Sequence, residues 1–345
     1  MSISSAHAPI SASHSCSSEV FGIYFGYKTA LQIVRAARGR PLAKLSGVRH
    51  AVPERALGKS RIEEAIRRVE SAYLDAPLER PAHVLVGSPS RCRPSGEYAL
   101  HVCTSRFKGD SFLRLGDGIC ASAPALAFIQ EAARCEDEIS LIELGFELCG
   151  TYQSWRTGVP TRYRAKPLAS VRALSDYVSD NPSVRGSGKA ARALRYLADG
   201  SASPRETRQA LVLGLPMGYG GHGLGIPRMN YEVRANAAAR AISGRSSFRC
   251  DLCWPEHKID VEYQSREWHE GEASRLADSR RTNALMAMGW TVIGVTNDEL
   301  ESFAATEGIA QTIRRHLGKR LQVRVSDYHA RKLKLRRQLC LPSNE

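Results

Sequence analysis

Long apolar runs are absent from this 345-residue sequence, and no stretch approaches the roughly 18 residues that a membrane-spanning helix requires. A secretion signal is absent as well. Residues 1–19, MSISSAHAPISASHSCSSE, have neither a cationic start nor an apolar core. Because the residues of this segment are mostly small and polar, we expect it to be a disordered N-terminal segment. The two absences argue against any association with a membrane.

The sequence also lacks a disulfide framework. Its nine cysteines are an odd number, and they are scattered from position 16 to position 340 without regular spacing. Such usage is typical of a reducing compartment rather than of a secreted domain held together by disulfides. We therefore predict a cytoplasmic location.

Acidic residues are fewer than basic residues. Asp and Glu total 35 against 49 Lys and Arg, which leaves a formal net charge of +14. An excess of this size favours polyanionic partners, of which nucleic acid is the commonest, although it also keeps a soluble protein dispersed. Residues 314–338 hold ten Lys or Arg and one acid, Asp327. We expect this basic segment either to be a solvated face or to contact the phosphates of DNA.

The length of the chain favours two domains. Residues 20–152 combine helical patterns with short β-branched runs, which predicts a small α+β domain. Helical spacing is clear over 60–74, where Ser60 and Glu63 have the spacing of a capping box. Residues 153–190 are basic and rich in Pro, Gly and Ser, so we interpret them as a linker region.

Residues 191–318 alternate between helical and strand patterns. This order predicts a mixed sheet flanked by helices, and hence an α/β fold for the C-terminal domain. The glycine-rich stretch PMGYGGHGLGIP at 216–227 lacks the lysine and the strand-loop-helix context of a nucleotide-binding loop. We expect it to be a flexible connection. Residues 319–345 would form a basic tail.

The segment CDLCWPEHKIDVEYQ (250–264) contains one CxxC pair, Cys250 and Cys253. A structural zinc site needs about four Cys or His ligands, and no second such pair occurs in the chain. Residues three apart on a strand point to opposite faces, so the two thiols are not expected to face one ion. We predict that both are small buried residues of a strand.

Charged and apolar residues alternate in IDVEYQ (259–264). Strand geometry places Asp260, Glu262 and Gln264 on one face. A strand in the middle of a domain carries a row of acids only where something cationic faces it. Asp251 lies on the preceding strand, across a short turn. Together Asp251 and Glu262 would form an oxygen-rich pocket suited to Mg²⁺ or Mn²⁺.

These features together resemble the restriction-endonuclease-like PD-(D/E)xK superfamily, in the branch related to very-short-patch repair endonucleases. The resemblance rests on GSASPRETRQALVLGLP, the Asp before the turn, the Glu-Tyr-Gln strand and DSRRTNALMAMGWTVIGVTNDEL. It covers roughly residues 198 to 302 in order, and it is specific as an ensemble rather than piece by piece. It implies a restriction-endonuclease-like α/β/α core in a bacterial protein.

The resemblance implies that Asp251 and Glu262 bind the metal ion. Gln264 would occupy the third position of the motif, where many members have Lys and this branch has Asp. An amide oxygen can ligate a metal but cannot act as a strong base. Glu206 would add a carboxylate near the metal, although with Ser203 as cap it also fits an ordinary helix start.

Further residues are expected to meet the substrate. The resemblance implies that His269, Asp278 and Arg281 line the pocket or hold a phosphate. Asp278 and Arg281, three apart on a helix, would otherwise form an ordinary surface ion pair. We expect Lys258, in the turn before the acidic strand, to bind phosphate as well.

The expected function is metal-dependent hydrolysis of DNA phosphodiester bonds by an endonuclease of the repair, restriction or phage-defence type. The alternative is a non-catalytic DNA-binding regulator, or an antitoxin-like protein, built on a degenerate nuclease fold. The pair Asp251 and Glu262 favours the enzyme, whereas Gln264 favours the regulator. In a third interpretation, an inert scaffold, the acidic row would be a coincidence.

Overall fold

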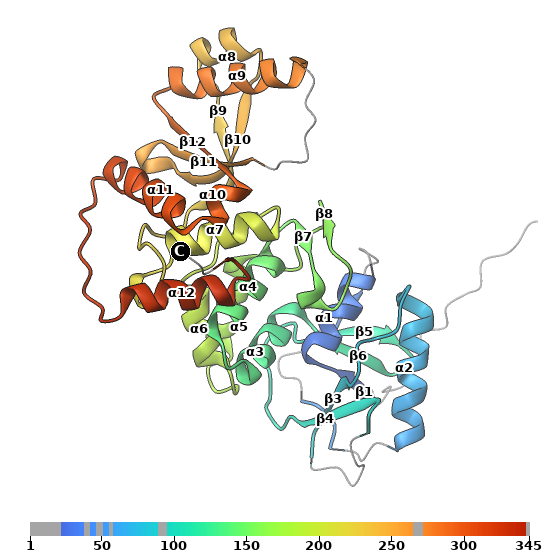
Figure 1. Cartoon of the computed structure of the whole chain (residues 1–345). Helices are drawn as coiled ribbons and strands as arrows, with labels where there is room; N and C mark the ends of the chain where they lie inside the picture. Colours follow the sequence, from blue (N-terminus) through green and yellow to red (C-terminus); the bar gives the residue numbers. More distant parts are fainter. Residues whose placement is uncertain are drawn as a thin grey trace, which may run out of the picture.

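The computed structural model describes residues 22–37, 42–45, 51–54, 58–88, 95–264 and 272–342. Within these ranges the chain forms a mixed α/β structure with twelve α-helices and three sheets (Figure 1). Two of the sheets belong to different halves of the chain. No helix in the described ranges is long and apolar enough to cross a membrane.

The N-terminal half is built on a six-stranded mixed sheet with the strand order β2-β5-β6-β1-β3-β4. β1 runs parallel to β6 and antiparallel to β3, and β3 runs parallel to β4. The strands are β1 (Ile23–Phe25), β2 (Ala43–Lys44), β3 (Ala82–Val86), β4 (Tyr98–Val102), β5 (Phe112–Gly116) and β6 (Ile119–Ser122).

Helices cover both faces of this sheet. α2 (Lys59–Tyr73) buries Ile62, Ile66 and Val69 at helical spacing against one face, in a cluster shared with β1, β3 and β6. The other helices of this half are α1 (Tyr27–Ala36), α3 (Pro124–Arg134) and α4 (Glu138–Cys149). The predicted cap Ser60 is wrong: α2 begins one residue earlier, and Gly58 takes the cap position without a side-chain hydrogen bond.

The segment between the two halves carries short elements. These are β7 (Tyr152–Gln153), a 3₁₀ turn η1 (Trp155–Thr157), β8 (Arg162–Tyr163), α5 (Val171–Asp180) and the start of α6 (Ser187–Leu194). α5 buries Leu174, Tyr177 and Val178. These three side chains belong to the large hydrophobic cluster that also holds residues of both sheets.

The C-terminal half contains a four-stranded sheet with the order β12-β11-β10-β9. Its strands are β9 (Arg228–Arg234), β10 (Ser247–Trp254), β11 (Ile259–Gln264) and β12 (Thr291–Thr296). β9, β10 and β11 form an antiparallel meander, and β12 joins β11 in parallel after a helical crossover. The four strands therefore follow one another in the predicted order, with a helix before the last strand.

Two groups of helices enclose this sheet (Figure 1). α8 (Ala237–Ser243) and α9 (Glu272–Ala287) pack on one face, where they share a cluster with Phe248 and Cys250. α7 (Pro204–Gly214), α10 (Asn297–Glu301) and α11 (Phe303–His316) lie on the other face, in the main cluster with Leu252 and Val261. The sequence pattern did not predict α8.

The glycine-rich segment 216–227 is packed rather than flexible, contrary to expectation. It contains the 3₁₀ turn η2 (Met217–Tyr219) and then folds back on the end of α7. Backbone N–H groups of His222, Leu224 and Gly225 donate to carbonyl groups of α7, at 2.9, 3.1 and 3.1 Å. Any side chain at Gly221 would collide with the Leu215 carbonyl oxygen, since an added Cβ would lie 2.2 Å from it.

The basic C-terminal segment contains α12 (Tyr328–Gln338), which packs against the body of the protein. Leu335 and Leu339 are completely buried. We therefore predict that Leu339→Ala lowers the free energy of unfolding by about 2–4 kcal/mol, because it leaves a cavity in a packed core. Leu321→Ala, at a 48% exposed position, should change it by less than about 0.5 kcal/mol. Equal effects of the two substitutions in urea unfolding would show that α12 is not part of the cooperative core.

Candidate functional site

The acidic row of β11 has the predicted alternation. Ile259 and Val261 point into the main hydrophobic cluster beneath α7 and α11. Asp260 and Glu262 point to the opposite face, toward α9, where Arg281 meets both carboxylates. Two acids therefore share the α9 side of the sheet, and something cationic faces them, as the burial argument requires.

The predicted orientation of the two cysteines is wrong. Cys250 and Cys253 are both fully buried, as expected, but they belong to the same cluster and their thiols contact each other. The strand alternation is broken between them, because Leu252 faces the opposite cluster. Across from this break, Asn230 of β9 has a left-handed backbone with φ of 49°. The parity rule for a regular strand therefore does not apply at this point.

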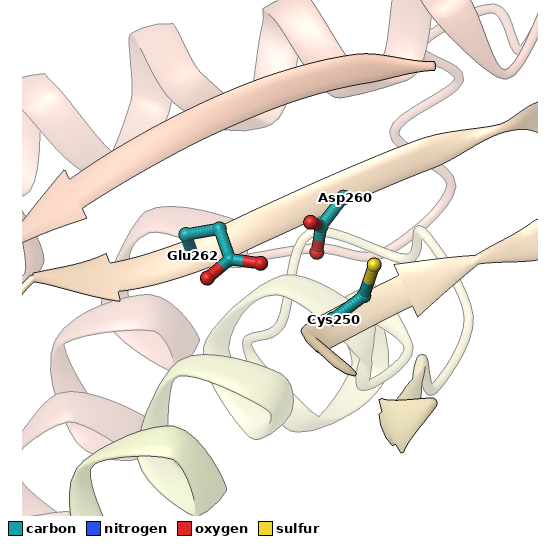
Figure 2. Close-up of side chains that lie close together, drawn as sticks. All are labelled: Cys250, Asp260 and Glu262. Atoms are coloured by element: carbon teal, nitrogen blue, oxygen red, sulfur yellow. The ribbon is translucent and has the colours of Figure 1, made fainter. Parts of the chain in front are cut away.

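One group of side chains in the described ranges has the spacing of metal ligands. It consists of Cys250 from β10 with Asp260 and Glu262 from β11, whose ligand atoms all lie within 4.8 Å of one another. Figure 2 shows the three side chains converging from the two adjacent strands. Asp251, the expected partner of Glu262, is not a member of this group.

Charge in this group is poorly balanced. Both carboxylate oxygens of Asp260 are buried without a hydrogen-bond partner in the described part of the chain. The Arg281 guanidinium lies 3.8 Å from Asp260, but it pairs more closely with Glu262, at 2.5 Å between Nη2 and Oε1. Arg281 also donates to the Arg249 carbonyl oxygen. A single guanidinium thus faces two carboxylates that lie side by side.

The pKa values of the acids reflect this imbalance. Burial, followed by the neighbouring Asp260, raises the pKa of Glu262 to about 8. Burial is also the largest of the influences that raise the pKa of Asp260 to about 7. Contact with Cys253, and then burial, raises the pKa of the Cys250 thiol well above its usual range. Without a second cation these groups hold protons near neutral pH.

Asp251 and Glu206 extend the acidic region toward α7. The Asp251 carboxylate accepts a hydrogen bond from the Tyr263 backbone N–H at 3.0 Å. Burial and then the charge of Glu262 raise the pKa of Asp251 to about 6. Burial and then the charge of Asp251 raise the pKa of Glu206. The four acids Glu206, Asp251, Glu262 and Asp260 thus form a chain in which neighbours influence one another.

Glu206 also has a structural role at the N-terminus of α7. Ser203 caps α7 by accepting a hydrogen bond from the Glu206 backbone N–H. In return, Glu206 accepts from the Ser203 hydroxyl at 3.0 Å, the Ala202 N–H at 3.0 Å and the Asn230 amide at 2.7 Å. Its carboxylate is therefore well satisfied by the protein, unlike that of Asp260.

Several predicted residues are not brought to the acidic cluster. Gln264 is exposed at the end of β11, and its amide lies against Gly294 of β12. Lys258 donates instead to the Met288 carbonyl oxygen at 3.0 Å, and it lies four residues from Glu262, roughly 13 Å along the strand. Asp278 is exposed, whereas Arg281 does reach the cluster, where it faces Asp260 and Glu262. His269 lies outside the described residues.

The donor set suits an oxygen-preferring divalent cation. The unsatisfied oxygens of Asp260, together with Glu262 and the nearby Asp251, are the ligands that Mg²⁺ and Mn²⁺ prefer. The Cys250 sulfur is a softer donor that Mg²⁺ does not favour. Sequence reasoning placed Asp260 on the correct face but gave it no role. Asp260 lies two residues from Glu262, on the same face of the strand, and this spacing could have indicated that Asp260 takes part in the site.

Comparison with known proteins finds two similar sequences. No family model matches the chain, and no solved structure matches it. Two proteins of Mycobacterium tuberculosis, from the strains CDC 1551 / Oshkosh and ATCC 25618 / H37Rv, are each 31% identical over 128 residues. Both are named only as uncharacterized proteins. The match covers 37% of this chain and 42% of each relative, so the chain spans less than half the length of the relatives it matches.

Proposed function

We propose that this protein is a metal-dependent endonuclease with a restriction-endonuclease-like C-terminal core, and that it hydrolyses phosphodiester bonds of DNA. One observation carries the proposal: the buried carboxylate of Asp260 and the neighbouring Glu262 share the single guanidinium of Arg281, and both oxygens of Asp260 lack a hydrogen-bond partner in the described part of the chain. Such an excess of negative charge in a half-buried site is relieved by a divalent cation. The helix-enclosed sheet with its acids on two neighbouring strands supports the same interpretation.

The acidic residues would have different tasks. Asp251, Glu262 and Asp260 would hold the ion through carboxylate oxygens, while Glu206 would add negative charge from the first turn of α7. When bound, Mg²⁺ or Mn²⁺ would polarise the phosphodiester and lower the pKa of a coordinated water. Arg281 fixes the Glu262 carboxylate through its Nη2 group. The excess of basic residues supplies the attraction to the DNA backbone.

A second candidate is a DNA-binding regulator that keeps the fold without catalysis. The ion pair between Glu262 and Arg281 favours it, because a carboxylate neutralised by a guanidinium has less need of a metal. Gln264 favours it too, since this side chain cannot serve as a charged general base. The excess of acids over guanidinium groups is the reason we prefer the enzyme.

Nicking of supercoiled plasmid by the purified full chain tests the proposal. We expect nicked and linear product with Mg²⁺ or Mn²⁺ and none in excess EDTA, because the acids alone cannot activate water. A gel shift of the same plasmid, run in parallel, measures binding. Binding without cleavage in every metal would overturn the enzyme and leave the regulator.

A further inference from the structure

A cavity in the described part of the chain has a lining that shares no residue with the acidic cluster. It measures about 960 Å³ and lies between the α6–α7 connection, the glycine-rich segment, β9 and the residues that follow α11. Its volume is at the upper end of the roughly 300–1,000 Å³ that is usual for ligand pockets. The residues that define its chemistry are Arg195, Tyr196, Arg228, Tyr231 and Lys319.

Cations and aromatic rings are paired within this lining. The Arg195 guanidinium lies 5.9 Å from the ring of Tyr196, and the Arg228 guanidinium lies 5.4 Å from the ring of Tyr231. The lining holds three cations and one acid, Asp199, so it is positive overall, although Arg228 also pairs with Glu256 outside the lining at 3.1 Å. Apolar side chains such as Leu197 and Ile226 complete it. A flat aromatic group that carries a negative charge matches these features.

The glycine-rich segment shapes one wall of the cavity. Gly223 and Gly225 line it, and both have a left-handed backbone, with φ of 68° and 91°. The Lys319 ammonium group donates to the Leu224 carbonyl oxygen at 2.6 Å, which fixes the first cation of the basic C-terminal segment at this wall. The segment lacks a phosphate-loop motif, but it does form part of a concave, positively charged surface.

The cavity adjoins the acidic cluster through β9. Met229 and Tyr231 line the cavity, and the residue between them, Asn230, donates its amide to Glu206 at 2.7 Å. The basic segment 314–338 itself contains only one Phe, Trp or Tyr residue, Tyr328. The fold supplies them from α6 and β9 instead.

We infer that this cavity binds the unpaired nucleotides of a single-stranded DNA segment, with bases against the two tyrosines and phosphates against the three cations. The inference rests on the proposed function, because the choice of DNA as the ligand comes from it. The new element is that the protein prefers single-stranded DNA. Stacked duplex bases cannot enter a cavity lined by side chains, whereas unstacked bases can.

Fluorescence anisotropy tests the inference in EDTA, so that cleavage cannot contribute. The probes are a labelled single strand of about 12 nucleotides and the corresponding duplex, a length within the usual site sizes. We expect the wild type to bind the single strand roughly tenfold more tightly than the duplex. Ala198→Trp fills the cavity and should abolish this preference. Ala191→Trp, exposed on the same helical region but outside the cavity, should keep it.

A charge variant keeps the test valid if Ala198→Trp fails to fold. Arg195 is exposed at the rim, and Arg195→Glu should weaken single-strand binding by about tenfold. Arg192→Glu makes the same charge change outside the cavity and should weaken it much less. Equal binding by all variants would overturn the cavity proposal, whether or not plasmid is nicked. A protein that binds through the cavity but never nicks would overturn only the catalytic proposal.

Discussion

Glu262→Gln is expected to lower the rate of metal-dependent plasmid nicking by at least about 100-fold. The substitution keeps the shape of the side chain but removes the charge that would bind a divalent cation. Asp251→Asn should have a similar effect. Its amide oxygen can still accept the hydrogen bond from the Tyr263 N–H, so the local backbone should remain in place. The measurement is the initial rate of supercoiled plasmid loss in Mg²⁺ and in Mn²⁺.

Glu232→Gln is the matched control for this experiment. Glu232 is exposed on β9, the neighbouring strand, and the substitution removes the same charge outside the cluster. Its nicking rate should remain within about twofold of the wild type. Thermal unfolding of all the variants separates loss of chemistry from loss of fold. Full activity of Glu262→Gln would remove the acidic cluster from the reaction.

The C-terminal fold was largely predictable because its elements carry strong local signals. The alternation in IDVEYQ required a strand with one apolar face, and Ile259 and Val261 do face the core. Ser203 and Glu206 marked the start of α7 correctly. α8 was missed because it is only seven residues long and is dominated by alanine, which gives no clear apolar stripe.

The candidate site was less predictable than the fold. Cys250 and Cys253 were wrongly predicted to point to opposite faces because the parity rule assumes a regular strand, and Asn230 on the neighbouring strand β9 interrupts that regularity. Arg281 was expected to meet substrate or an acid on its own helix. It reaches instead across to Glu262, which is a long-range pairing that no local pattern encodes. Tertiary packing decides both positions, and one sequence without relatives does not report it.

Arg281→Met is expected to give the largest loss of stability in the C-terminal half. It removes the guanidinium that faces Asp260 and Glu262 but keeps an apolar side chain of similar reach. Loss of one partner leaves buried carboxylates uncompensated, and this should lower the free energy of unfolding by about 3 kcal/mol at about pH 8. The measurement is urea unfolding of the metal-free protein.

The loss should depend on pH in a defined direction. A carboxyl group whose pKa is raised by folding lowers stability as the pH rises from its unfolded pKa, and the loss is complete above its folded pKa. Removing the guanidinium raises the folded pKa further, so the variant and the wild type differ only at pH values where the wild-type acids ionise. The relevant values are about 6 for Asp251, about 7 for Asp260 and about 8 for Glu262. The difference between Arg281→Met and the wild type should therefore shrink to about 1 kcal/mol at about pH 6, where Asp260 and Glu262 are mostly protonated.

Two comparisons make this result specific to the cluster. Arg280→Met, at the exposed neighbouring position, should change the free energy of unfolding by less than about 0.5 kcal/mol at either pH. Saturating Mn²⁺ should restore more stability to Arg281→Met than to the wild type, because the ion replaces the missing positive charge. A loss that is equal at the two pH values and insensitive to Mn²⁺ would instead mean that Arg281 stabilises the fold by packing. The charge of the acids would then not require a cation to balance it.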